Sequence, residues 1–127
     1  MWRMLARGLT RHCPLCGGGG LFTSWLAMRP HCPTCSYRFE RRGADAFFLG
    51  AILINFATTE GVLGVMLLVS FVLTLPDPPL LLLCAIAVPL MVAAPIAFYP
   101  FSKTIWAAFD LMIKPAAPDD YATRATR

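Results

Sequence analysis

The sequence predicts a small zinc-ribbon module built of β-hairpin knuckles, followed by an α-helical transmembrane hairpin and an interfacial C-terminal helix. Three observations lead to this fold class. Two pairs of cysteines lie near the N-terminus, two long apolar runs follow them, and the charges are unevenly distributed. Charged residues make up 14% of the 127 residues, whereas a typical soluble domain has about 25%. This composition is too apolar for an ordinary soluble domain and indicates a membrane protein.

Charge and composition divide the chain into segments. Residues 1–45 carry seven arginines against two carboxylates, whereas residues 46–101 contain no basic residue. A basic head before an apolar body is typical of a membrane protein with a soluble N-terminal module. We expect a basic amphipathic segment at 1–11, a zinc ribbon at 12–42, a first transmembrane helix with a cytoplasmic extension at 46–75, a second transmembrane helix at 80–101, an interfacial helix at 102–114 and a disordered tail at 115–127.

The first segment is amphipathic. Arg3, Arg7 and Arg11 fall on one helical stripe, and Trp2 lies with apolar residues on the opposite one. Such a helix suits an anionic lipid surface, where each basic residue contributes roughly 1 kcal/mol, and Trp2 would then be interfacial. A solvated helix without lipid contact is the alternative, and the sequence leaves both open.

The cysteine pairs predict a metal site. Cys13 and Cys16 are separated by two residues, fifteen residues follow, and Cys32 and Cys35 repeat the spacing. This pattern is typical of a zinc site with four thiolate ligands. Proline after the first cysteine of each pair stiffens the turn, and Gly17 can take the positive φ that such turns require. Four thiolates leave no open coordination position, so the zinc is structural and supplies folding free energy.

Other uses of these thiols fit less well. Disulfides are disfavoured on the cytoplasmic side of a membrane, and neither pair has the strand–helix context of a thioredoxin-like redox motif. Iron is chemically compatible with the same four thiolates, as in rubredoxin, and is the less favoured ion. His12 and His31 each precede a cysteine and could replace a thiolate, but we expect both outside the ligand set. Cys84, inside the second apolar run, is interpreted as a small buried apolar residue.

The apolar runs predict two transmembrane helices. About 20 apolar residues span a bilayer, and the runs at 46–75 and 80–101 are both long enough. The proline-rich turn at 76–79 has no Lys or Arg, so the positive-inside bias places both termini in the cytoplasm. No secretory signal is visible, and we expect a two-span protein of the cell (inner) membrane. Pro89 and Pro95 predict bends in the second span.

Polar residues lie inside the first span. Glu60 is its only charged residue, and Asn55 lies nearby. A carboxyl group in hydrocarbon is costly and marks a candidate functional site, with a proton or ion path as one interpretation. We favour a polar packing contact between helices, in which Glu60 bonds to Tyr99 or Ser102 across the hairpin or to another chain. The small residues around Glu60 predict a close helix contact.

Aromatic and basic residues mark the exit from the second span. Tyr99 and Trp106 lie where interface aromatics belong, and Lys103 can extend toward the headgroups. The apolar stripe that follows predicts an interfacial helix at 102–114, which packs against the ribbon. The tail after it is small and polar, and this composition favours disorder.

Several of these segments together resemble one protein family. The stretches "CPLCGGGGLF", "CPTCSYRFER" and "DAFFLGAILINFATTEG" resemble the bacterial domain-of-unknown-function family 983, and "FYPFSKTIWAAFDL" resembles the exit segment of its actinobacterial-type members. The resemblance implies a cytoplasmic zinc ribbon on a two-span membrane anchor and no established activity. Some relatives are encoded beside cytochrome oxidase assembly genes. Ser36 stands where the family often has Gly, which implies a different conformation of the second knuckle.

Three functions compete. The closed metal site and the basic head favour an interaction or assembly module for a membrane complex, with the lipid bilayer and an unidentified protein as partners. A transport or proton-handling subunit would use Glu60 and would act as a homo-oligomer, because two spans enclose no conduit. A membrane-tethered nucleic-acid or ribosome binder would use the arginines and two exposed aromatic residues, Tyr37 and Phe39. We expect no enzyme, because no Ser/His/Asp set and no pair of carboxylates stands out.

Overall fold

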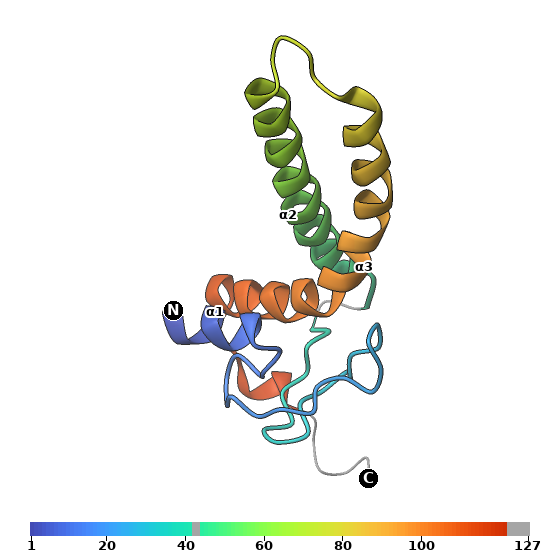
Figure 1. The fold of residues 1–127 in the computed structure, drawn as a ribbon. Helices are drawn as coiled ribbons and strands as arrows, with labels where there is room; N and C mark the ends of the chain where they lie inside the picture. Colours follow the sequence, from blue (N-terminus) through green and yellow to red (C-terminus); the bar gives the residue numbers. More distant parts are fainter. Residues whose placement is uncertain (42–43, 122–127) are drawn as a thin grey trace.

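The computed structural model describes residues 1–41 and 44–121 of the chain. Its helices are α1 (Trp2–Leu9), α2 (Ala44–Leu73), α3 (Leu80–Ile113) and a short 3-10 helix, η1 (Pro118–Asp120). Figure 1 shows α2 and α3 as a tall hairpin, with α1 and the cysteine segment (residues 11–41) gathered at its base. The candidate metal ligands therefore lie at the end of the hairpin that also holds the N-terminus and η1.

Helices α2 and α3 are each long and apolar enough to cross a membrane. They contain 30 and 34 residues, and a span needs about 20. Most of their large apolar side chains are exposed, whereas a core helix of a soluble protein buries such side chains. Helix α2 ends at Leu73, two residues before the predicted boundary, because Pro76 disfavours the helical conformation at Leu75.

The second apolar run and the exit segment form one helix. The sequence predicts separate helices at 80–101 and 102–114, whereas α3 continues from Leu80 to Ile113. A proline inside a helix removes one hydrogen bond and kinks the helix, but the residues that follow can resume the helical pattern. The exit segment is therefore a bent continuation of α3.

Helix α3 bends sharply before it reaches the base. Figure 1 shows the bend in the orange part of the ribbon, between an upper limb (residues 80–99) that runs beside α2 and a distal limb (residues 100–113) that lies across the base of the hairpin. We define the distal limb as beginning at Pro100, whose missing N–H removes the hydrogen bond to Ile96 and favours a bend there. The sequence predicts bends at Pro89 and Pro95, and Pro95 lies five residues before Pro100.

Helix α1 packs against the distal limb. Gly8 makes the close approach, since an added Cβ there would lie 3.1 Å from the main-chain oxygen of Thr104. The Thr104 hydroxyl donates to the Gly8 main-chain oxygen at 2.6 Å. Helix α1 then ends in a Schellman turn, in which the His12 N–H donates to the Arg7 oxygen at 2.9 Å and Arg11 adopts a φ of 60°. This turn directs the chain from α1 into the first cysteine pair.

One apolar core joins the cysteine segment to the helices. Tyr37 and Phe39, which are 1% and 3% exposed, pack edge to face inside it. The other members come from the cysteine segment, from the first turns of α2 and from the distal limb. These are Cys13, Leu21, Cys32, Phe47, Ala107 and Leu111. The cysteine segment is therefore docked on the hairpin and not merely tethered to it.

The predicted β-hairpin knuckles are not formed as strands. Within residues 1–41 and 44–121, the cysteine segment has isolated bridges only, such as those that pair Phe22 with Met28 and His31 with Arg38. Pro30, next to His31, has no N–H with which to extend the pairing into a ladder. Loops and single bridges, instead of a ribbon of strands, carry the cysteines.

The C-terminal tail folds back on the cysteine segment. The sequence predicts disorder over 115–127, but η1 forms at Pro118–Asp120 and Tyr121 packs edge to face on Tyr37, with 6.0 Å between the ring centroids. Tyr121 covers the buried Tyr37 and so attaches the tail to the cysteine segment, which the composition of the tail does not predict. Residues 122–127 of the predicted tail, residue 42 at the end of the predicted ribbon and residue 43 lie outside the described residues.

Arg41 ties three parts of the molecule together. Its guanidinium forms ion pairs with Asp110 of the distal limb at 2.8 Å and with Asp120 of η1 at 3.0 Å. It also donates to the main-chain oxygen of Lys114 at 2.8 Å and lies over the ring of Tyr37. Burial alone would lower the pKa of Arg41, but its bonds to Asp110 and Asp120 raise it on balance. The guanidinium therefore stays charged and holds the tail against the helix.

Candidate metal centre

The four predicted ligands converge at one point. The Sγ atoms of Cys13, Cys16, Cys32 and Cys35 all lie within 4.8 Å of one another. Cys13 and Cys35 are 3.8 Å apart between sulfurs, and Cys16 and Cys32 are 3.7 Å apart. A tetrahedron with Zn–S bonds of about 2.3 Å has edges of about 3.8 Å, whereas a disulfide needs about 2.05 Å. The five cysteines of the chain are all described and all free thiols, and the geometry of the four fits a tetrahedral thiolate site. Cys84, predicted to be buried, is exposed on the surface of α3 instead.

The two knuckles have the same backbone geometry. In the first, the Gly17 N–H donates to the Cys13 oxygen at 2.8 Å, and the Cys13 N–H donates to the Gly18 oxygen at 2.9 Å. In the second, the Ser36 N–H donates to the Cys32 oxygen at 2.9 Å, and the Cys32 N–H donates to the main-chain oxygen of Tyr37 at 2.9 Å. Each turn thereby directs both of its sulfurs to the same side.

Ser36 adopts the conformation that the first knuckle gives to glycine. The φ angles are 60° at Ser36 and 76° at Gly17. The expectation that Ser36 changes the turn is therefore wrong, because the hydrogen bonds of the knuckle impose the left-handed conformation whichever residue is present. A non-glycine residue there costs roughly 1–2 kcal/mol, so the second knuckle is strained.

Gly18 is required by the contact between the two knuckles. Its N–H donates to the Cys16 sulfur at 3.3 Å, and an added Cβ would collide with the side chain of Thr34 in the second knuckle. The run of glycines after Cys16 thus includes a residue whose lack of a side chain lets the knuckles approach each other.

Burial sets the ionisation of the thiols before metal binds. It raises the pKa of Cys13 strongly and that of Cys35 to about 11. Burial also opposes ionisation of Cys32, but the backbone N–H groups of Cys35 and Thr34 lower its pKa on balance. Thiolates are the metal ligands, so metal binding must displace protons from the more protonated members of the set.

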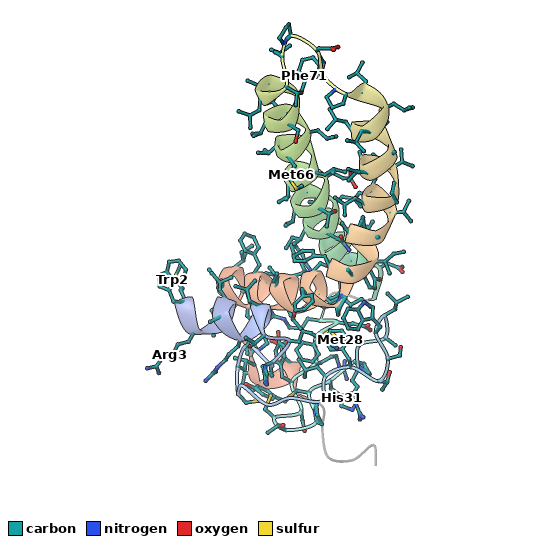
Figure 2. All side chains as sticks on the ribbon, viewed as in Figure 1. Trp2, Arg3, Met28, His31, Met66 and Phe71 are labelled. Carbon is teal, nitrogen blue, oxygen red and sulfur yellow. The ribbon has the colours of Figure 1, made fainter. Side chains whose placement is uncertain are left out.

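The histidines next to the cysteines lie outside the thiol group. His12 is exposed, and its Nδ1 hydrogen-bonds to the main-chain oxygen of Thr10 at 2.7 Å. His31 is also exposed, and Figure 2 shows it on the side of the cysteine segment that faces away from the hairpin. Among the described residues, the group that could hold a metal ion consists of the four cysteines alone.

A loop between the cysteine pairs reaches the bend of α3. The indole Nε1–H of Trp25 donates to the main-chain oxygen of Ile96 at 3.0 Å. Lys103 donates to the main-chain oxygen of Leu26 at 2.8 Å and lies over the ring of Tyr99. Lys103 and Tyr99, predicted as interfacial residues, therefore also help to attach this loop to the helix. We name residues 22–28 the clamp loop.

Arg11 reinforces the same attachment. Its guanidinium carbon lies 4.9 Å from the ring centroid of Phe22, 5.0 Å from that of Trp25 and 5.8 Å from that of Phe101. Such cation–π contacts contribute about 0.5–2 kcal/mol each, depending on desolvation. Arg11 therefore joins the clamp loop to the distal limb from below α1.

Trp106 and Trp2 occupy different environments. Trp106 packs on α2, where an added Cβ at Gly50 would collide with the indole, and it stacks on Phe109 at 6.3 Å between centroids. Trp2 is 83% exposed. Of the two predicted interfacial tryptophans, Trp106 is therefore held against α2 by packing, whereas the indole of Trp2 is exposed.

The predicted intramembrane polar residues also differ. Asn55 is 3% exposed, and its Nδ2 donates to the main-chain oxygen of Pro95 in α3 at 2.9 Å. Glu60 is partly exposed, and the described residues contain no hydrogen bond from it to Tyr99 or to Ser102, whose hydroxyl donates to the Tyr99 oxygen. Asn55, not Glu60, makes the polar contact between the two helices.

The small residues near Glu60 make no close helix contact within this chain. An added Cβ at Gly61 or Gly64 would meet no atom from another part of the described structure within 4 Å. The close contact that these residues predict therefore has no partner among the described residues of a single copy.

The two aromatic residues that the nucleic-acid hypothesis requires for base stacking lie in the core. Tyr37 and Phe39 were expected to be exposed, but they pack against Tyr121 and against each other. Stacking of bases needs an accessible ring face. The hypothesis of a nucleic-acid binder thus loses the aromatic platform on which it relied.

A comparison with protein families identifies the chain. The family model described as "Protein of unknown function (DUF983)" matches residues 22–110, more than half of the chain. The chain belongs to the DUF983 family. The DUF983 match covers the second cysteine pair, both long helices and the distal limb as far as Asp110, and Cys13 and Cys16 lie before it. No curated protein and no solved structure matches the chain.

Proposed function

We propose that this DUF983 protein is an integral membrane protein whose four-cysteine module holds a structural zinc ion on the cytoplasmic side and serves as an interaction or assembly module for a membrane complex. The convergence of the four sulfurs to tetrahedral spacing carries the proposal. A closed set of four thiolates leaves no coordination position for a substrate. The ion would therefore hold a shape and would not act as a catalyst.

The hairpin supports a membrane location. Its two helices are long and apolar enough to span a bilayer, and their large apolar side chains are exposed. All eleven Lys and Arg residues of the chain lie outside residues 46–101, and the turn between the helices has none. The positive-inside bias then favours a cytoplasmic base, with the thiols in a reducing compartment.

Zinc is the proposed ion because four thiolates in a tetrahedron are its usual structural site. Iron fits the same sulfurs, so elemental analysis of the purified chain decides between them. We expect one zinc per chain and loss of that zinc in Cys32→Ser, with Cys84→Ser as the matched control because Cys84 lies outside the group. A stoichiometric iron content would replace zinc in the proposal, and a chain without either metal would overturn it.

The knuckles present a fixed outer face. His31, Thr34 and Arg38 are exposed, while the opposite side of the cysteine segment shares a core with α2 and the distal limb. Figure 2 shows His31 pointing away from the hairpin. A surface held rigidly in this way loses little conformational entropy when a partner binds, which suits a docking role.

Site-specific photo-cross-linking tests the docking role. A photoreactive residue at position 31 or 38 in growing cells should give one discrete protein adduct, and the adduct should disappear when Cys32→Ser removes the metal site. The matched control is position 3 on α1, an exposed residue on another element. A chain that gives no adduct from any knuckle position, although it binds zinc and lies in the membrane, would contradict the interaction role.

A further inference from the structure

Two helices lie across the base of the hairpin. Figure 1 shows α1 and the distal limb side by side and roughly crosswise to the direction in which α2 rises. The present inference rests on the proposed membrane-spanning hairpin, because a hairpin that crosses the bilayer fixes the plane of its surface. Both crossing helices would then run along that surface.

The hairpin side of the distal limb is apolar. Trp106 packs on Gly50 of α2, so its stripe faces the hairpin. Phe109 and Ile113 follow at helical spacing on the same stripe, and both are exposed. The opposite side of the limb, with Ala107 and Leu111, is buried against the cysteine segment.

Helix α1 continues this apolar surface. Figure 2 shows the Trp2 side chain pointing to the hairpin side of α1 and the Arg3 side chain pointing to the opposite side. Leu9 lies seven residues after Trp2, on the same helical stripe, and both side chains are exposed. The helix is thus oriented with its apolar stripe toward the membrane side of the molecule.

Only part of the basic stripe remains available to lipid. Arg7 donates to the main-chain oxygens of Pro14 at 3.3 Å and Leu15 at 2.7 Å, and Arg11 stacks on the clamp loop. Of the three arginines in the predicted stripe, Arg3 is the one exposed on the surface. Attraction to anionic headgroups is therefore a minor contribution, and burial of apolar area is the main one.

We propose that Trp2, Leu9, Phe109 and Ile113 form an apolar plate that inserts into the boundary between headgroups and acyl chains of the leaflet from which the hairpin rises. Leu49 and Leu53, in the first turns of α2, are also exposed. Amphipathic helices insert about 5–10 Å into this boundary. A lipid surface is the occupant because the plate lies along the plane that the hairpin defines.

Quenching by brominated phospholipids tests the plate in the full-length, zinc-loaded chain in phosphatidylcholine vesicles. The difference between the wild-type protein and Trp2→Phe isolates the emission of Trp2. Lipids brominated near the headgroup end of the acyl chain should quench this emission more strongly than lipids brominated near the chain end. The depth control is Met66→Trp in the Trp2→Phe background, since Met66 is exposed in the middle part of α2.

The control separates failure of the plate from failure of the spanning hairpin. Deep bromines should quench the Met66→Trp probe. If they do and no brominated lipid quenches Trp2, the plate is wrong and the hairpin stands; a copy or partner protein covering Trp2 would give this result. If no bromine quenches the Met66→Trp probe, the proposed membrane protein itself fails.

Salt distinguishes an apolar plate from an electrostatic one. In vesicles that contain anionic phosphatidylglycerol beside phosphatidylcholine, about 1 M salt shortens the Debye length to about 3 Å, yet the quenching of Trp2 should persist, and Arg3→Gln should leave it unchanged. Loss of the quenching at high salt or in Arg3→Gln would show that charge holds α1 to the lipid and would overturn the apolar plate.

Discussion

The indole N–H of Trp25 donates to the main-chain oxygen of Ile96, four residues before Pro100, at 3.0 Å. In an unbroken helix that oxygen would accept from the N–H of residue 100, and proline has none. The clamp loop therefore supplies the hydrogen bond that the bend of α3 leaves unmade. The metal module and the direction of the distal limb depend on the same contact.

Trp25→Phe should destabilise the protein by about 1 kcal/mol, the usual net contribution of one hydrogen bond. Phenylalanine keeps an aromatic ring near Arg11, although a smaller one, so the loss of the N–H must be separated from the loss of packing. Thermal unfolding of the zinc-loaded protein in detergent measures the total loss.

Pro100→Ala gives this substitution a sharp control. Alanine restores the N–H at residue 100, so Ile96 regains its helical partner and no longer needs Trp25. In the Pro100→Ala background, Trp25→Phe should cost much less than it does alone, a coupling that a double-mutant cycle reports. An equal cost in both backgrounds would show that the tryptophan acts through packing only.

Ser36→Gly should stabilise the zinc-loaded protein by about 1 kcal/mol, because it removes the penalty of a left-handed residue. The gain is smaller than the full penalty because glycine has more freedom in the unfolded chain. Gly17→Ser is the matched change in the other knuckle and should destabilise, since its φ is 76° and its Cβ would also approach Arg7. Chemical unfolding measures the free energy of unfolding of both variants. A lower value for Ser36→Gly than for the wild-type protein would show that the second knuckle is not strained at Ser36.

The ligand set and the long helices could be predicted because their signals are local. The spacing of the cysteines predicts the two turns that carry Cys13, Cys16, Cys32 and Cys35, and the unbroken apolar runs predict the two long helices. Positive φ at Gly17 follows from the same pattern. The likeness of Ser36 to Gly17 could have been predicted as well, because the repeated Cys-Pro-x-Cys turn fixes the next residue whatever its side chain.

The docking of the module could not be predicted, because it is carried by residues far apart in the sequence. Trp25 and Ile96 are 71 positions apart, and Arg41 is 79 positions from Asp120. A lone tryptophan in a loop and an arginine before α2 have no spacing that reveals a partner. Pro100 did carry a usable signal: a proline inside a helical pattern predicts a freed oxygen at Ile96 that some donor must satisfy.

Removal of zinc should release the clamp loop while most of the helix remains. Metal binding supplies the folding free energy of a segment that has little core of its own, whereas α2 and α3 do not contain the ligands. A chelator should therefore shift the tryptophan emission, through Trp25, with little loss of helical circular dichroism. Trp25→Phe should remove most of the shift. Unchanged emission after stoichiometric removal of zinc would show that the loop stays docked without the metal.

Acid should detach the C-terminal tail. The Ala117 N–H donates to the Asp120 carboxylate at 2.8 Å, and this bond, with Arg41, lowers the pKa of Asp120 below its usual 3.8. A depressed carboxyl pKa stabilises the folded state above the unfolded pKa, and this stabilisation is lost as the pH falls through the lower folded value. The tail should thus be fully held at pH values above about 4–5 and progressively released as the pH falls from the usual pKa through the lower folded pKa.

Hydrogen exchange of the Arg38 amide follows this release, because that N–H donates to the Asp120 main-chain oxygen at 2.8 Å. Its protection should fall as the pH drops below 4 in the wild-type protein, where about 3.9 is an ordinary aspartate pKa. Asp120→Asn should show weaker protection at neutral pH and lack this component of the acid loss. Since acid also acts on the thiolates and on Asp110, the other partner of Arg41, the part shared by both proteins belongs to groups other than Asp120. Identical pH profiles would contradict a role for Asp120.

Thr104→Val should loosen α1 from the distal limb. The Thr104 hydroxyl is fully buried and donates to the Gly8 oxygen at 2.6 Å, so an isosteric methyl removes one hydrogen bond at a cost of about 1 kcal/mol. Thr104→Ser keeps the hydroxyl and is the matched control. Amide exchange in α1 should rise in Thr104→Val and stay closer to wild type in Thr104→Ser. Equal exchange in the two variants would mean that the close approach at Gly8, and not the hydrogen bond, holds α1 in place.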